Sequence, residues 1–129
     1  MAKENEFLTD LGGAANVLEI EPCITRLRVE VADPALVDDA ALKRLEYLYW
    51  YTLEFGLVEE DGKRKAVGAG LLSSFGELGD FEKHAEIRPL DCDAAAAIPY
   101  DPTRYQELLF VSPSFDRMVE DVSAWLERQ

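Results

Sequence analysis

One long amphipathic stretch, residues 38–56 (DDAALKRLEYLYWYTLEFG), constrains this chain most strongly. Apolar side chains recur in it at three- and four-residue intervals, which is the spacing of one broad helical stripe. Asp38 and Asp39 stand at its start, where helix N-termini favour carboxylates, and Gly56 stands where a C-terminal cap is expected. The pattern predicts a single helix around which the rest of the chain is organised.

The composition is that of a globular protein with a strong negative charge. A chain of 129 residues predicts one domain. The 13 basic and 26 acidic residues leave a net charge of −13, which argues against nucleic acid or an anionic membrane as partner and is also what solubility alone would favour. No apolar run approaches the roughly 20 residues of a membrane span, and the first residues lack the apolar core of a secretory signal. We therefore expect a cytoplasmic protein.

Before the long helix, two stretches of alternating apolar and charged residues predict a β-hairpin. The first surrounds Leu18 and Ile20, the second runs over residues 26–31, and residues 22–25 connect them. Asp33-Pro34 ends the second strand.

The hairpin connector carries residues that suit anion chemistry. Arg26 and Arg28 are two residues apart and project from one side of the second strand, next to Cys23. Two nearby cations favour the thiolate and would bind phosphate, and Thr25 adds a hydroxyl. The alternative is a small buried cysteine in an ordinary basic-faced hairpin. Cys23 and Cys92 are expected to be free thiols in a reducing compartment.

The motif GG-x(2)-N followed by C-x-T-R-L-R-V, within residues 7–45, resembles the opening half of the IIB domain of the glucose family of the sugar phosphotransferase system. The resemblance implies that Cys23 is a phosphocysteine that accepts its phosphoryl group from a IIA partner. It also implies that Thr25, Arg26 and Arg28 form a phosphate-holding rim. The strands and last helix of that family do not follow here, so the geometry of the loop depends on what replaces them.

After the long helix, the chain reads as a series of short elements. Residues 57–58 and 65–67 flank a hairpin turn at Asp61-Gly62, and residues 87–90 read as a short edge strand. An alanine-rich helical turn over residues 91–98 precedes a strand over 107–111. Ser114 is expected to cap a last helix, whose stripe predicts core packing; its members are Phe115, Met118, Val119, Val122, Trp125 and Leu126.

The segments YWYTLEFGL and GAGLLSSFGE, followed by PSF, make residues 46–129 resemble the C-terminal part of the catalytic domain of biopterin-dependent aromatic amino acid hydroxylases. The resemblance implies that Glu54 corresponds to an iron ligand and that Trp50 and Ser73 belong to the amino acid pocket. That family holds iron through two histidines and one carboxylate.

The family's two histidines come from a segment that is not matched here, and the lone His84 lies in an unmatched loop. We therefore expect Glu54 to be a metal-site remnant without iron, either facing solvent or paired with Arg64 or Lys65. The cofactor-binding region is also unmatched, so we expect neither a bound cofactor nor hydroxylase turnover.

Together these patterns predict one α+β domain over residues 1–129, with a mostly antiparallel sheet and helices packed on one face. It would combine a IIB-like part (residues 1–45) with a hydroxylase-like part (46–129). Three functions stay open: a chimeric scaffold, engineered or naturally fused, without native turnover; a phosphoryl acceptor served by a IIA donor; and residual binding of an aromatic amino acid or metal. Fold and ancestry do not guarantee function. Oligomeric state, a homodimer included, is left open.

Overall fold

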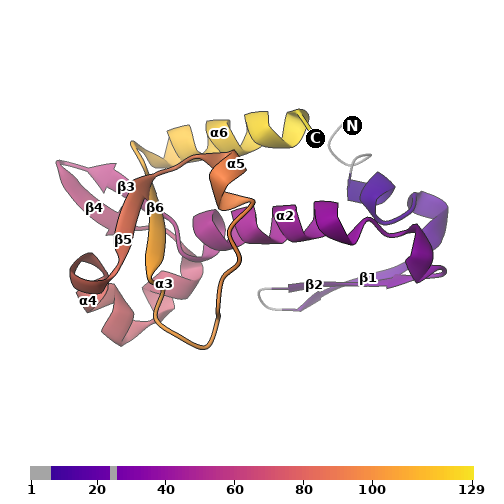
Figure 1. Ribbon diagram of the computed structural model, residues 1–129, viewed down its shortest axis with the longest axis horizontal. Coiled ribbons are helices and arrows are strands. Elements are labelled where there is room, and N and C mark those ends of the chain that lie inside the picture. The colour runs from indigo at the N-terminus through magenta and orange to yellow at the C-terminus, as the bar shows by residue number, and fades with distance from the viewer. Residues whose placement is uncertain (1–6, 24–25) are drawn as a thin grey trace. The chain divides into compact units, whose positions relative to one another are not determined.

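The computed structural model describes residues 7–23 and 26–129 (Figure 1). The chain divides into two compact units, one formed by residues 1–43 with Gln129 and the other by residues 44–128. Among the described residues, no helix is both long enough and apolar enough to cross a membrane.

The first unit is built around the predicted hairpin. Strand β1 (Val17–Cys23) pairs antiparallel with β2 (Arg26–Val31), and Ile20 lies opposite Val29. Residues 7–10 are helical, and the short 3₁₀ turns η1 (Ala14–Asn16) and η2 (Pro34–Leu36) flank the two strands. The alternation of apolar and charged residues therefore identified both strands correctly.

Asn16 ties the ends of this hairpin together. Its side-chain amide donates to the carbonyls of Leu11, at 2.7 Å, and Asp33, at 3.0 Å, and its side-chain oxygen accepts from the Asp33 N–H at 2.8 Å. Asn16 is buried, so each of these bonds satisfies a polar group that has lost water.

The long helix changes character at its C-terminal end. Helix α2 (Asp39–Tyr49) is followed by η3 (Trp50–Glu54), a π-helical turn in which the Phe55 N–H donates to the Trp50 carbonyl at 2.8 Å. The prediction of one regular helix over residues 38–56 is therefore wrong in its last turn. Asp38 caps the start as expected, accepting from the Ala41 N–H at 3.0 Å. Short π-helical insertions are rare and are frequent at functional sites.

The second unit contains a four-stranded sheet in the order β4-β3-β6-β5. Strands β3 (Leu57–Glu60) and β4 (Lys63–Ala66) form the predicted hairpin, with positive φ angles at Asp61 and Gly62. Strand β6 (Leu108–Ser112) runs parallel to both β3 and β5 (Glu86–Pro89). The sheet is thus mixed, and the expectation of a mostly antiparallel sheet is wrong, although the α+β class is confirmed.

Helices cover both faces of this sheet, not one face as expected (Figure 1). Phe110 packs with residues of α2, α5 (Cys92–Ala95) and α6 (Phe115–Glu127). Its strand neighbours Leu109 and Val111 pack in a second cluster with residues of α3 (Ala69–Ser73) and α4 (Phe75–His84). A central strand with parallel neighbours is buried on both faces, which explains its continuous apolar sequence.

Helix α6 begins as predicted, with the Ser114 hydroxyl accepting from the Arg117 N–H at 3.1 Å. Its stripe is buried in part. Met118 and Trp125 are buried, but Phe115 and Val119 are about half exposed, at 52% and 46%. The stripe predicted a wider contact than the helix makes, since of its six members only Met118 and Trp125 are buried.

Candidate functional site

The π-helical turn η3 carries two of the candidate residues, Trp50 and Glu54, at its two ends. The Thr52 hydroxyl donates to the Leu48 carbonyl at 2.7 Å, which adds a side-chain bond where the helical hydrogen-bond pattern changes. The predicted iron-ligand carboxylate and the predicted pocket tryptophan are therefore carried by the same short turn, four residues apart.

Glu54 is buried, with 7% of its surface exposed. Its carboxylate accepts a hydrogen bond from the Tyr49 hydroxyl, with 3.2 Å between the oxygens. Helix α3 passes close by, since a Cβ added at Gly70 would lie 2.8 Å from Glu54 Oε2. Burial, together with the Glu54 charge and this hydrogen bond, raises the pKa of Tyr49 above its usual value.

The expected partners of Glu54 are engaged elsewhere. Arg64 lies 4.0 Å from Glu82, and Lys65 lies 3.4 Å from Glu60. Both expectations for Glu54, exposure to solvent or pairing with one of these cations, are therefore wrong. A buried carboxylate is more stable with a hydrogen-bond donor than without one, and the nearby hydroxyl of Tyr49 meets that need.

Trp50 lies between two other aromatic rings. Phe55 stacks on it with 4.5 Å between ring centroids and 29° between planes, and Tyr100 stacks with 3.9 Å and 5°. The indole N–H donates to the Gln106 side-chain oxygen at 3.0 Å. The two rings stacked on this indole are thus side chains of the protein, Phe55 and Tyr100.

Gln106 fixes the irregular segment 98–107 that supplies Tyr100. Its side-chain amide donates to the carbonyls of Asp101, at 2.9 Å, and Arg104, at 3.0 Å. Its backbone N–H donates to the buried carboxylate of Glu77 at 2.6 Å. Sequence reasoning missed Tyr100, Gln106 and Glu77, because each acts through a partner at least 29 positions away and no local pattern marks such pairs.

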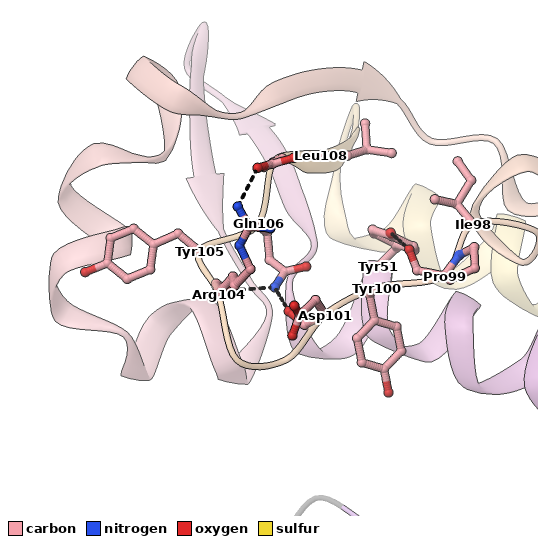
Figure 2. A pocket seen from close by; sticks show the side chains of 10 residues that line it. Tyr51, Ile98, Pro99, Tyr100, Asp101, Arg104, Tyr105, Gln106 and Leu108 are labelled. Atoms are coloured by element: carbon pink, nitrogen blue, oxygen red, sulfur yellow. Dashed lines mark hydrogen bonds and ion pairs between the residues drawn. The ribbon is translucent and has the colours of Figure 1, made fainter.

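A cleft of about 310 Å³ is lined mainly by the same segment (Figure 2). Tyr51, Ile98 and Leu108 form its apolar wall, and Asp101 and Arg104 are polar residues of its lining. The Tyr51 hydroxyl donates to the Pro99 carbonyl at 3.2 Å, which holds the segment at one end of the cleft.

Comparison with known proteins identifies the family of this chain. Residues 29–128 match the model of the biopterin-dependent aromatic amino acid hydroxylases. The chain belongs to this family. It is 45% identical to bovine tyrosine 3-monooxygenase over 93 residues, which are 71% of this chain and 19% of that protein. It is 38% identical to phenylalanine 3-hydroxylase of Streptomyces coeruleorubidus over 124 residues, 95% of this chain and 44% of that protein.

Solved hydroxylase structures agree with this assignment. Phenylalanine hydroxylase of Chromobacterium violaceum with bound Fe(III) superposes with a TM-score of 0.62 and 30% identity, over 70% of this chain and 34% of that one. The iron- and phenylalanine-bound form of the same enzyme gives 0.62 and 31%, over 69% and 35%. The chain spans less than half the length of these hydroxylases.

A second, smaller match supports a two-part architecture. Residues 5–38 match the EIIB model of the phosphotransferase system. The hydroxylase match begins at residue 29, earlier than the expected boundary at residue 46, so the two matches overlap over residues 29–38. The alignment with phenylalanine 3-hydroxylase covers 95% of the chain and so extends into the EIIB-matched residues.

Ser73, the third residue of the expected hydroxylase pocket, is exposed on α3. Its hydroxyl donates to the Gly70 carbonyl at 3.0 Å, within its own helix. The same helix passes beside the Glu54 carboxylate at Gly70, and no hydrogen bond from Ser73 to Glu54 is among those described.

The described residues of this hydroxylase-family chain do not fit an iron ion. Within residues 7–23 and 26–129, no three or more His, Cys, Asp or Glu side chains gather as a metal site would require. His84 is exposed at the end of α4, where its ring stacks on Tyr105 with 5.6 Å between centroids. One carboxylate hydrogen-bonded to Tyr49 is not a ligand set for a transition metal.

The expected phosphate-binding residues fall largely outside the described parts. Thr25 is not among the described residues, and of Cys23 and Arg26 the backbone alone is described, with the two residues opposite each other in the hairpin register. Arg28 is exposed on β2, opposite Glu21. The rim predicted from these residues stays a prediction.

Cys92, the other cysteine of the chain, is among the described residues. It is a free thiol, buried in the cluster beneath α6. Burial, with the charges of Asp121, Asp91 and Asp93, raises the pKa of its thiol from 9.0 to about 11. It is therefore a packing residue with little thiolate at neutral pH.

Proposed function

We propose that this chain, taken by itself, is a scaffold of the hydroxylase family that carries out no hydroxylation. One observation carries the proposal: the candidate site residues Glu54 and Trp50 are already engaged by other side chains of the same unit. The Glu54 carboxylate accepts from Tyr49, and the indole of Trp50 is stacked between Phe55 and Tyr100. A site filled by its own side chains offers neither a cluster of metal ligands nor a free aromatic wall.

The test is a turnover assay with an iron titration. Purified chain is incubated with Fe(II), a reduced pterin and either phenylalanine or tyrosine, and products are measured by mass spectrometry. We expect no hydroxylated product above the protein-free control, and the same calorimetric response to Fe(II) for wild type and Glu54→Ala. A hydroxylated amino acid that disappears in Glu54→Ala would show that the proposal is wrong.

A second function is favoured by the match of residues 5–38 to the EIIB model, which includes Cys23, Thr25, Arg26 and Arg28. We propose that the first unit accepts a phosphoryl group on Cys23 as part of a chimera of two family fragments. The thiolate of Cys23 would attack phosphorus, an S–P bond would form, and the P–N bond to the donor histidine would break. The histidine nitrogen then takes a proton, and the guanidinium groups stabilise the transferred charge.

This reaction is tested with a phosphorylated IIA protein as donor. We expect the mass of one phosphoryl group on the wild-type chain and on Cys92→Ser, and its loss in Cys23→Ser. Arg28→Ala is expected to slow the transfer, because one cation near phosphorus is removed. If the wild-type chain gains no phosphoryl mass, or if Cys23→Ser still gains it, the phosphocysteine proposal fails.

The third function, residual binding of an aromatic amino acid around Trp50, Glu54 and Ser73, has less support. It would need a free face of the Trp50 ring, but Phe55 and Tyr100 already stack on that ring. We therefore place it behind the other two.

A further inference from the structure

We propose that the outer edge of strand β2 is a dimerisation surface, which pairs antiparallel with β2 of a second copy of this chain in a register centred on Val29. In this register Arg28 of each copy lies opposite Glu30 of the other. The inference goes beyond both proposed functions and depends on neither, since it needs no bound metal, amino acid or phosphoryl group.

The first argument is that β2 has an open edge. It pairs with β1 on one side, and the described residues supply no strand to its other side. Such an edge carries unpaired backbone N–H and C=O groups and is a template for another strand. The outer edge of β1 is a poorer template, because Pro22 has no N–H to donate and Glu19 and Glu21 would face carboxylates of the second copy.

The second argument is that the charges of β2 are complementary to themselves. Charged and apolar residues alternate in its sequence, RLRVEV. A pair centred on Val29 places both Arg28 side chains opposite Glu30 side chains and Val29 opposite Val29. Centring the pair on Arg28 or on Glu30 would place like charges opposite each other, and the registers between would oppose charged residues to apolar ones. One register therefore satisfies both halves of a two-fold symmetric, closed pair.

The third argument is that Glu30 lacks a favourable neighbour across its own hairpin. It lies opposite Glu19, whereas Arg28 lies opposite Glu21. Glu19 and Glu30 are both exposed, and like charges directly opposite each other destabilise a strand pair. Arg28 of a second copy supplies the cation that β1 does not supply to Glu30.

The fourth argument is the apolar face of the hairpin. Ile20 lies opposite Val29, so the two side chains share a face, and Ile20 is 45% exposed. Pairing of two copies extends this row across four strands, with Ile20 and Val29 of one copy followed by Val29 and Ile20 of the other. A hairpin of two strands is marginally stable, whereas a sheet of more strands with an apolar face is stable enough to persist.

The experiment reverses the charges on the proposed edge. Sedimentation velocity is measured on the full chain over a series of concentrations, in about 0.15 M salt, which screens the repulsion between two chains of net charge −13. The variants are Arg28→Glu, Glu30→Arg and the double variant that carries both changes. We expect wild type to dimerise at concentrations below about 1 mM. Each single variant should dimerise at least about tenfold more weakly, because two cross-copy attractions become repulsions, and the double variant should regain the wild-type dimer.

The matched control is Glu19→Arg. It changes the net charge as much as Glu30→Arg does, and both variants remove the repulsion between Glu19 and Glu30 inside the hairpin. Glu19→Arg leaves Arg28 and Glu30 in place, so we expect it to keep the dimer. Because Glu30→Arg makes the hairpin itself no less stable than Glu19→Arg does, loss of its dimer reports on the edge. This comparison decides the question if Arg28→Glu does not fold.

A mixture of the two single variants provides a test of specificity. When Arg28→Glu meets Glu30→Arg, every charge on one edge lies opposite its counter-charge on the other. Native mass spectrometry should therefore show more heterodimer than either homodimer. The proposal is overturned if wild type stays monomeric up to about 1 mM. It is also overturned if Glu30→Arg dimerises as strongly as Glu19→Arg, or if two folded single variants form no heterodimer.

Discussion

Each of the two units of this protein is stabilised internally by a different kind of contact. Among the described residues of the first unit, Leu11 and Asn16 are the buried ones, and Asn16 acts through three hydrogen bonds. The second unit buries two apolar clusters on opposite faces of a four-stranded sheet. A two-stranded hairpin is marginally stable on its own, whereas a sheet covered on both faces buries enough apolar surface to fold. The difference teaches that the first unit depends on a polar residue and the second on packing.

The largest effect is expected in the core of the second unit. Phe110→Ala should lower the free energy of unfolding by about 3–5 kcal/mol, because it removes a buried ring from the central strand. Phe115→Ala is the matched control, since Phe115 is 52% exposed and its loss should change stability by less than about 0.5 kcal/mol. Chemical denaturation followed by circular dichroism measures both. Equal losses would mean that burial does not distinguish these two rings.

In the first unit, Asn16→Ala should lower stability by about 2 kcal/mol, because it leaves the Asp33 N–H and two carbonyl groups without their partner. Hydrogen exchange should become faster in β1 and β2, with little change in β6. Glu19→Ala, at an exposed position of β1, is the control and should leave exchange unchanged. If β6 amides lose protection to the same extent, the two units unfold together and the contrast between them is wrong.

Glu77→Ala should cost about 1–2 kcal/mol, since the buried N–H of Gln106 loses its acceptor. The effect should be concentrated in segment 98–107, where exchange at Gln106 would be faster and the NMR signal of the Trp50 indole N–H would move. Glu82→Ala on the same helix is exposed and should have no such effect. An unchanged Trp50 signal in Glu77→Ala would show that this carboxylate does not hold the segment.

The smallest effect concerns the thiols. With the folded pKa of Cys92 near 11, about 0.1% of it is thiolate at pH 8, so in Cys23→Ser a thiol reagent should label the folded chain far more slowly than the denatured chain. The folded pKa lies above the unfolded value of 9.0, so the folded state holds this proton more tightly. Stability is therefore lost as the pH rises above 9.0, and the loss between pH 9 and 11 should be smaller in Cys92→Ala. Rapid labelling of Cys23→Ser at pH 8 would contradict the burial of this thiol.

Local patterns predicted many of the elements because their causes are local. Asp61-Gly62 marked a hairpin turn, and both residues have the positive φ angles that such a turn needs. Ser114 marked a helix start, and its hydroxyl caps the helix. The parallel pairing of β6 was missed because no local signal states which strands become neighbours. The π-helical turn was missed because a single turn of π-helix hardly changes the spacing of apolar residues from that of an α-helix.

In the candidate site, too, some features follow from the sequence and others from the tertiary structure. The amino-acid sequence by itself determined the family, the carboxylate at Glu54 and the tryptophan four residues before it, since these lie in one short segment. The tertiary structure alone decided that Glu54 is buried against Tyr49 and Gly70, and that Trp50 is covered by Tyr100 from a segment 50 positions later. The physical reason is that burial and stacking depend on which distant segments the folded chain brings together, and those contacts leave no periodic trace in the sequence.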